Sequence, residues 1–235
     1  MNTDLETLQK KINYHFKDSA YLKHALIHPS YSGEMRWGRD RSNQRLEFLG
    51  DAVLELIISD YLYRTYETLE EGELTRKRSS LVFEAALNVC ARDIGLGDFI
   101  YLGKGEASSN GREKPSILSD TFEALIGAIF LDGGYEAAKR FIYAFLIDDI
   151  DELSLLHDGK SVIQEYTQRF SDMPLRYNTY SLESPDHQKQ FRSELYIREE
   201  LVASAEGHSK KSAEQNAALL AVKKLGIQST GHQCI

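Results

Sequence analysis

Cysteines and long hydrophobic runs are scarce in this sequence, and each shortage argues against certain classes of protein. Cys90 and Cys234 stand far apart without a CxxC spacing, so a cytosolic, reducing location is the default expectation. The longest apolar run, AVLELIISDYLY (52–63), contains Glu55 and Asp60, so no membrane span fits. The polar N-terminus lacks the apolar core of a secretory signal. We therefore expect a cytoplasmic protein with no membrane partner.

Common catalytic motifs are absent too. Gly-Lys-Gly (103–105) does not make a Walker or GxGxxG loop. His24 and His28 form HxxxH, but the glutamate of a zinc-protease HExxH motif is missing and Pro29 would end the helix. The Glu-x-x-His pairs of a di-iron bundle do not occur, and neither cysteine has a triad context. These absences argue against the corresponding enzyme classes.

The composition is that of a globular chain with a sizeable core. It has 235 residues, of which 42% are hydrophobic and 27% charged, enough for one large domain or two modest ones. The net charge of −8, read globally, argues against a nucleic-acid partner. Local distribution matters more, because a basic pair near the C-terminus can bind phosphates in an acidic protein.

Apolar residues follow a helical period through the first 147 residues. The pattern predicts helices over 4–13, 19–28, 43–66, 73–94, 115–131 and 135–147. The polar segment 102–116, with three glycines and a proline, is interpreted as a loop. No strand alternation is strong enough to build a sheet here. We predict an all-α domain over 1–150.

The pattern changes after the acidic stretch DDIDELSLLHD (148–158), where we place a linker over 151–157. A short helix is predicted over 160–170 and an alanine-rich helix over 208–226. Between them, three strand-like runs are separated by turns at 184–186 and 198–200: LRYNTYSLE, KQFRSELYIR and ELVASAEG. We predict a small α+β domain of α-β-β-β-α order over 158–227, followed by a flexible tail over 228–235.

Two pairs of carboxylates interrupt apolar helices. Glu47 and Asp51 are four residues apart and share a helix face that continues with apolar side chains. A lone pair of this kind is more often the solvated edge of a helix. A second pair, Asp120 and Glu123, lies three residues apart in another apolar helix and favours a shared site.

Mid-helix glycines accompany both pairs. Gly50 precedes Asp51, and Gly127 lies one turn beyond Glu123. Such glycines cost about 1 kcal/mol relative to alanine, so they indicate that two helices approach closely. A crossing there would bring four carboxylates together, a ligand set that suits Mg²⁺ or Mn²⁺.

The last predicted helix begins with basic residues. Ser209 can cap it, while Lys210 and Lys211 stand in its first turn, where the helix dipole favours acidic residues. Lysines on a solvated helix face are common. Their unfavourable position, together with free backbone N–H groups, points instead to a phosphate-binding site.

The C-terminal segment resembles the double-stranded RNA-binding domain. The resemblance rests on KSVIQE (160–165), SPDHQKQF (184–191) and SKKSAEQNAA (209–218). It implies that Lys210 and Lys211 contact phosphates across the major groove and that recognition depends on A-form shape and 2′-hydroxyls. The residues expected to bind RNA are Gln164, Glu165, Pro185, Asp186, His187, Ser209, Lys210 and Lys211.

The N-terminal domain resembles bacterial ribonuclease III, and the two resemblances together span nearly the whole chain. NQRLEFLGDAVLE (43–55) corresponds to the signature motif of that family, and KPSILSDTFEALIGAIFLDGG (114–134) to its second acidic block. HALIHPSY (24–31) and EGELTRKRSSLV (71–82) match its other segments, so HALIH is interpreted as structural. The resemblance implies the ribonuclease III endonuclease fold.

The resemblance also implies a mechanism. Glu47, Asp51, Asp120 and Glu123 would hold Mg²⁺, with Mn²⁺ as a substitute, and Asp51 and Glu123 are the residues assigned to catalysis. The metal would activate a water that attacks the scissile phosphate and would stabilise the departing 3′-oxygen. The expected products are 5′-phosphate and 3′-hydroxyl ends with short 3′ overhangs.

Members of the family act as homodimers in which each acidic centre cuts one strand. The apolar side chains around the signature motif are therefore candidates for dimer contact: Phe48, Leu49 and Val53. A place in the core of the single chain is the alternative interpretation of these residues.

One position departs from the family pattern. Gln44 stands where a glutamate is common, while Glu71 matches a further acidic position, and both are expected to contact RNA near the cut. Glutamine keeps the size and the hydrogen bonding but carries no charge. Two functions stay open: a double-stranded RNA endonuclease in ribosomal RNA precursor and mRNA processing, and a catalytically weakened RNA-binding regulator.

Overall fold

The computed structural model describes residues 4–147, 159–160, 162–164, 166–168, 173–182, 190–207 and 209–227, apart from the side chain of Arg39. The chain forms two compact units, Met1–Ile150 and Asp151–Ile235, which are considered separately. The linker predicted over 151–157 and the tail predicted over 228–235 lie outside the described residues.

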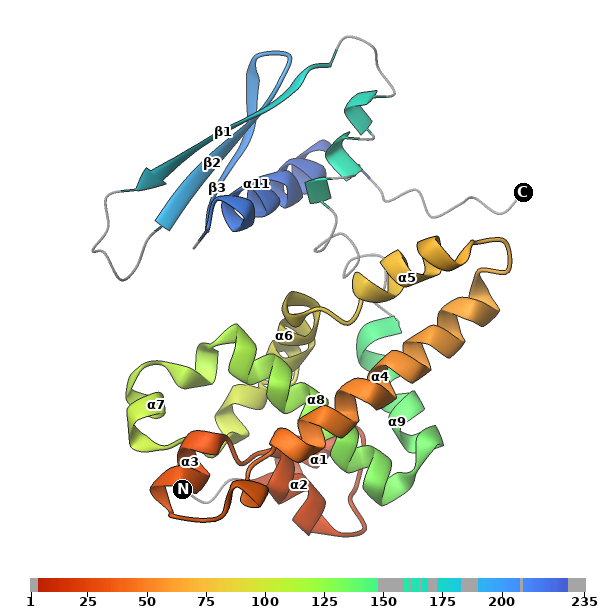
Figure 1. The fold of residues 1–235 in the computed structure, drawn as a ribbon, viewed down its shortest axis with the longest axis vertical. Helices are drawn as coiled ribbons and strands as arrows, with labels where there is room; N and C mark the ends of the chain where they lie inside the picture. The colour runs from red at the N-terminus through yellow and green to blue at the C-terminus, as the bar shows by residue number, and fades with distance from the viewer. Residues whose placement is uncertain are drawn as a thin grey trace. The chain divides into compact units, whose positions relative to one another are not determined.

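The first unit is helical, as predicted (Figure 1). Its helices are α1 (Leu5–Lys11), α2 (Ser19–Ala25), α3 (Pro29–Glu34), α4 (Gln44–Thr65), α5 (Glu71–Ser79), α6 (Glu84–Asp93), α7 (Lys104–Ser108), α8 (Pro115–Gly133) and α9 (Tyr135–Ile142). Short turns of other helix types are η1 (Arg39–Arg41), η2 (Leu96–Phe99), η3 (Gly111–Glu113) and the π-helical η4 (Tyr143–Ile147). Among the described residues of this unit, β pairing is limited to a single bridge between Ile27 and Tyr101.

Several helix boundaries differ from the sequence predictions. The helix predicted over 73–94 is two helices, α5 and α6, because the chain leaves the helix after Ser79 and turns Leu81 into the core. The apolar residues keep the helical period across this break, so the sequence pattern does not indicate it. The helix predicted over 19–28 ends at Ala25, and Pro29 then occupies the first position of α3, where its missing N–H costs nothing.

The segment predicted as a loop over 102–116 also contains structure, namely α7 and η3. Its composition does not favour a helix, but contacts distant in sequence stabilise one. The Lys104 N–H donates to the Glu34 carboxylate over 2.7 Å, and Gly103 packs against the Ser30 backbone so closely that a Cβ would lie 2.6 Å from its carbonyl oxygen.

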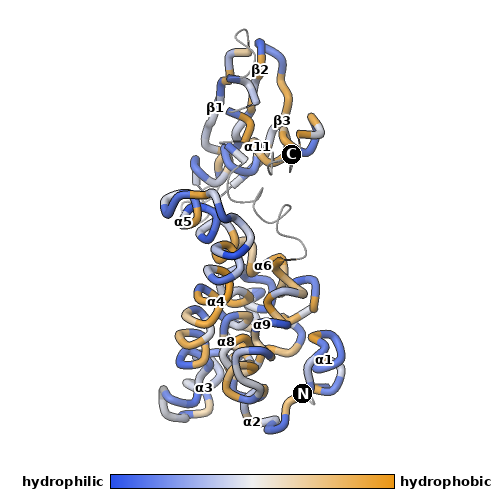
Figure 2. The backbone as a smooth tube through the Cα atoms, turned by 90° about the vertical axis from the view of Figure 1, so that its right-hand side faces the viewer, coloured by the Kyte–Doolittle hydropathy of each residue, from blue (hydrophilic) through white to orange (hydrophobic). Residues whose placement is uncertain are grey.

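The core of this unit is built around α8, which runs beside α4 through the middle of the helices (Figure 1). Nearly every residue of α8 from Ile117 to Ile129 is buried, whereas no residue of α5 is, and α5 is accordingly hydrophilic in Figure 2. A buried helix of this kind is apolar on most sides. Polar side chains in α8 therefore need a specific reason.

The second unit has the predicted order of strands and final helix. Strands β1 (Leu175–Leu182), β2 (Gln190–Ile197) and β3 (Glu200–Gly207) form an antiparallel sheet in the order β1-β2-β3, and α11 (Lys210–Leu225) packs against it. Of the helix predicted over 160–170, the residues that the structure describes are helical. The α+β assignment is confirmed.

The tight turn between β2 and β3 lies where the sequence places it. Arg198 and Glu199 both have positive φ values, 50° and 67°, which is the backbone of a two-residue hairpin turn. One face of the resulting sheet contributes Leu195 and Ile197 to a core shared with the alanines of α11. Within the described part of the chain, none of the helices is both long and apolar enough to cross a membrane.

Candidate metal centre and RNA-binding surface

Helices α4 and α8 touch backbone to backbone. A Cβ on Gly50 would lie 1.8 Å from the carbonyl oxygen of Glu123, and a Cβ on Gly127 would lie 2.3 Å from the carbonyl oxygen of Leu46. Both distances are far below any real Cβ contact, so only glycine fits at either position. The close approach predicted from the two mid-helix glycines is therefore present.

This crossing brings the four predicted carboxylates near one another, so their negative charges interact. The pKa of Glu123 is raised to about 8, first by burial and then by the negative charges of Asp51, Asp120 and Glu47. Burial, followed by the charges of Asp120 and Asp51, likewise raises the pKa of Glu47. The two pairs are thus one electrostatic cluster.

Within the described residues, the cluster of Glu47, Asp51, Asp120 and Glu123 forms no ion pair with a cationic side chain. Ionised carboxylates at a partly buried site without a counter-charge are unfavourable. Their oxygens are suitable ligands for a hard divalent ion. Even so, no three His, Cys, Asp or Glu side chains among the described residues are arranged as they stand to hold a metal ion. The residue types fit a divalent ion, while the ligand geometry is not formed.

A fifth acidic residue, Glu84, was not singled out from the sequence. It is exposed at the first position of α6, and its negative charge is the main cause, after burial, that raises the pKa of Asp120. Its neighbours in sequence, Phe83 and Ala85, give no sign of this role. Only the packing of α6 against α8 brings it near the cluster.

The two residues expected near the scissile bond are both at helix starts. Gln44 is the first residue of α4 and Glu71 the first residue of α5, and both are exposed. An exposed Gln44 adds no charge to the cluster and removes none. The apolar side chains in the signature motif differ in exposure. Val53 is 5% exposed and belongs to the core, whereas Phe48 is 80% exposed.

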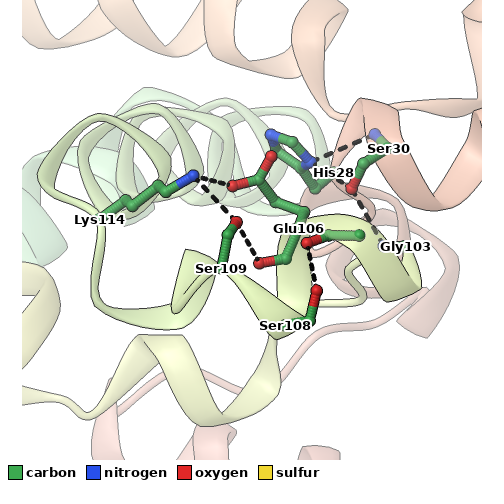
Figure 3. A network of polar contacts seen from close by, with 8 residues as sticks. His28, Ser30, Gly103, Glu106, Ser108, Ser109 and Lys114 are labelled. Atoms are coloured by element: carbon green, nitrogen blue, oxygen red, sulfur yellow. Dashed lines mark hydrogen bonds and ion pairs between the residues drawn. The ribbon is translucent and has the colours of Figure 1, made fainter. Parts of the chain in front are cut away.

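The second histidine of HxxxH, His28, belongs to a structural network shown in Figure 3. His28 Nδ1 lies 2.7 Å from Ser30 Oγ, which also accepts the N–H of Gly103 over 3.0 Å. Lys114 pairs with Glu106 and donates to Ser109 Oγ over 3.2 Å. His28 Nδ1 accepts the N–H of Ser30 over 3.2 Å, and burial lowers the pKa of the ring. This network ties the segment before α8 to α3 and so fixes where α8 begins.

The start of α11 has the features expected of a phosphate site. Ser209 caps the helix, its side chain accepting the N–H of Ser212 over 3.1 Å. Lys210 and Lys211 follow, both exposed, and no acidic residue stands in the first turn. Gly207 brings the end of β3 within contact of this turn, since a Cβ there would lie 2.5 Å from the Ala213 nitrogen.

The other predicted RNA-binding residues are only partly described. Gln164 is helical and exposed. Glu165, Pro185, Asp186 and His187 lie outside the described residues. The helix that bears Gln164 is joined to α11 by an ion pair between Lys160 and Glu214, and Thr179 Oγ1 of β1 donates to the same glutamate over 3.1 Å.

Two family models match the chain. The ribonuclease-III-like model matches residues 18–150, and the double-stranded RNA binding motif matches residues 160–225. The matched segments contain the carboxylate cluster and the start of α11, respectively.

Named relatives agree with both matches. "Ribonuclease 3" of Desulfotalea psychrophila is 47% identical over 220 residues, covering 92% of this chain and 91% of the relative. "Ribonuclease 3" of Caldanaerobacter subterraneus is 44% identical and covers 95% and 99%. Among solved structures, the nuclease domain of ribonuclease III from Campylobacter jejuni is 41% identical with a TM-score of 0.57, covering 65% of this chain and 96% of that one.

These likenesses extend over both units and over nearly the whole length of the relatives. A weakened RNA-binding regulator is not favoured, and membership of the family implies dependence on a divalent metal ion. The chain belongs to the ribonuclease III family and is an endonuclease of double-stranded RNA.

Proposed function

We propose that Glu47, Asp51, Asp120 and Glu123 form the catalytic metal site and that Mg²⁺ is the ion they hold, with Mn²⁺ as a substitute. The observation that carries this proposal is the backbone contact of α4 and α8 at Gly50, which holds four carboxylates with no cationic partner among the described residues. Because the helices already touch, ligand geometry requires rotation of side chains rather than movement of helices.

When bound, the ion supplies a nucleophilic water near neutral pH and charge stabilisation at the phosphate. The carboxylates of the chain orient that ion, and Asp51 and Glu123 are the two on which hydrolysis most depends. The partly buried carboxyl of Glu123, whose pKa is about 8, would exchange its proton for a bound cation. The products have 5′-phosphate and 3′-hydroxyl ends with short 3′ overhangs.

The second unit captures the substrate. Lys210 and Lys211 contact phosphates at the start of α11, where free backbone N–H groups add to their charge. Gln164 and Glu165, with the Pro185-Asp186-His187 loop, face the minor grooves. The unit therefore selects A-form duplexes by shape. Gln44 and Glu71 engage the RNA near the cut.

The active form is a homodimer in which each subunit cuts one strand. Three side chains of α4 support this assignment, because they are large, apolar and exposed: Phe48 (80%), Leu56 (58%) and Tyr63 (75%). A solved nuclease domain of ribonuclease III from Campylobacter jejuni, 42% identical with a TM-score of 0.56, is described with a region involved in dimer formation. The setting is cytoplasmic, and the substrates are precursors of ribosomal RNA and duplex segments of mRNA.

Cleavage of a long RNA duplex with Mg²⁺ tests the metal site. Asp51→Asn and Glu123→Gln should each lower the rate by about 10³-fold or more, since both remove a ligand charge used in the transition state. Duplex binding in Ca²⁺ should persist in both variants, which separates a chemical defect from lost affinity. Glu136→Gln, which neutralises an exposed carboxylate of α9, is the matched control. Unimpaired cleavage by both site variants would refute the proposal.

A further inference from the structure

Asn43, the residue before α4, is buried without partners for its side chain. It is 1% exposed, and neither Nδ2 nor Oδ1 has a hydrogen-bond partner in the described part of the protein. An asparagine at this N-cap position normally accepts a backbone N–H, but here it makes no such bond. Leaving a buried polar group unpaired costs about 1–3 kcal/mol. The amide therefore needs a partner in the working protein.

The backbone holds Asn43 in place. Its N–H donates to the Ile27 carbonyl over 2.8 Å, and its carbonyl accepts the N–H groups of Leu46 and Glu47, both over 2.9 Å. Leu46 is itself pressed against Gly127 of α8. With its backbone held and only 1% of the residue exposed, the amide is out of contact with solvent, so its partner must lie beside it.

Glu47 is the polar side chain on the same stripe of α4. Asn43 has helical dihedral angles (φ −67°, ψ −12°), so positions 43, 47 and 51 follow one another at intervals of four along one face. Side chains in a helix lean toward its N-terminus, which directs Glu47 over the turn that contains Asn43. Glu47 is partly buried, and the charged groups that act on it, Asp120 and Asp51, are both acidic, so neither of them donates to it.

We propose that Asn43 is a positioning residue for the metal site: its Nδ2–H group donates to the Glu47 carboxylate, directly or through one bound water. This bond pairs the donor group of the buried amide and holds the carboxylate in the rotamer that leaves its other oxygen free for the divalent ion. The assignment rests on the proposed role of Glu47 as a metal ligand. Partners of this kind behind a ligand commonly change metal affinity about 10–100-fold.

Titration of the metal-free, full-length protein with Mn²⁺ in the absence of RNA tests this role. Asn43→Leu keeps the branching at Cγ and removes the polar groups, and it should weaken Mn²⁺ binding by about tenfold. Its melting temperature should hold or rise, because an unpaired buried amide has been replaced by an apolar group. Asn43→Ala, which adds no bulk, should weaken Mn²⁺ binding to the same extent and replaces the leucine variant if that protein does not fold. Ser80→Ala, another buried polar site, should leave Mn²⁺ binding unchanged.

A double-mutant cycle separates the two assignments. If Asn43 acts through Glu47, then Asn43→Leu should have no further effect on Mn²⁺ binding in a Glu47→Gln protein. Mn²⁺ affinity within twofold of the wild type in folded Asn43→Leu and Asn43→Ala proteins would overturn the positioning role and leave the ligand role of Glu47 intact. An unchanged affinity in Glu47→Gln itself would instead remove Glu47 from the ligand set, and the positioning role with it.

Discussion

The nitrogen of Gly127 lies 3.0 Å from the point where a Cβ on Gly50 would stand, so α4 and α8 meet at two glycines. This contact lets the acidic stripes of two helices face each other. A methyl group on Gly50 would also lie 1.8 Å from the backbone of Glu123, where nothing flexible can give way. The crossing is thus a structural requirement of the carboxylate cluster.

Gly50→Ala should therefore destabilise the first unit by about 3 kcal/mol or more, since overpacking here must separate two backbones. For a unit of this size, that corresponds to a fall in Tm of about 6–12 °C. Gly72→Ala is the matched control, because α5 leaves open space around that glycine, and it should be neutral or slightly stabilising. Thermal unfolding followed by circular dichroism compares the two, and equal melting temperatures would contradict the crossing.

The pKa of Glu123 predicts how the metal-free protein responds to pH. Its folded pKa of about 8 lies above the ordinary value of 4.5, so between these values the folded state binds more protons than the unfolded state. The stability linked to this group is present below pH 4.5 and is lost as pH rises toward 8. Glu47 and Asp120, whose pKa values are also raised, act in the same direction.

Urea unfolding in EDTA between pH 5.5 and 8.5 measures this dependence. Glu123→Gln should flatten the pH profile and be more stable than the wild type at pH 8.5, because glutamine mimics the protonated acid. Saturating Mg²⁺ should flatten the wild-type profile as well, since the ion binds the ionised form. A wild-type profile that rises with pH in EDTA would be inconsistent with the cluster.

Gln44 offers a direct comparison with the common glutamate. It is exposed, and single exposed charges contribute up to about 1 kcal/mol, so Gln44→Glu should change kcat/KM by less than about fivefold. Single-turnover cleavage of a duplex in Mg²⁺ measures the change. A gain of a hundredfold or more would mean that glutamine had silenced the enzyme.

Lys210 and Lys211 should control the salt dependence of duplex binding. Replacing each by alanine should weaken binding across all sequences and lower the slope of log affinity against log salt by about one per lysine. Lys223→Ala removes the same charge from the other end of α11 and should leave the slope unchanged. Binding is measured in Ca²⁺ at several salt concentrations, and equal slopes for all three variants would exclude the phosphate contacts.

A feature of the fold or of the site can be predicted from the sequence when the residues that indicate it lie close together in the chain. Gly50 and Gly127 sit beside acidic residues in otherwise apolar helices, so the crossing can be predicted from a local conflict between residue type and environment. The break before α6 and the helix α7 have no such signal, because Leu81 keeps the apolar period and Glu34 stabilises α7 from far away in the sequence. Glu84 reaches the cluster only through helix packing.

A substitution at Phe48 tests the proposed homodimer. It lies in the signature motif, and its exposed fraction of 80% is the opposite of what a core residue shows. Buried aromatic side chains at interface centres contribute about 2 kcal/mol or more, so Phe48→Asp should raise the dimer dissociation constant by about 30-fold.

Sedimentation velocity at several concentrations measures this shift. Leu220→Asp, which charges an exposed apolar side chain of α11, is the matched control and should sediment as the wild type does. A Phe48→Asp protein that keeps the wild-type dissociation constant would place the dimer contact elsewhere. A monomeric variant that still nicks single strands of a duplex would instead support one acidic centre per subunit.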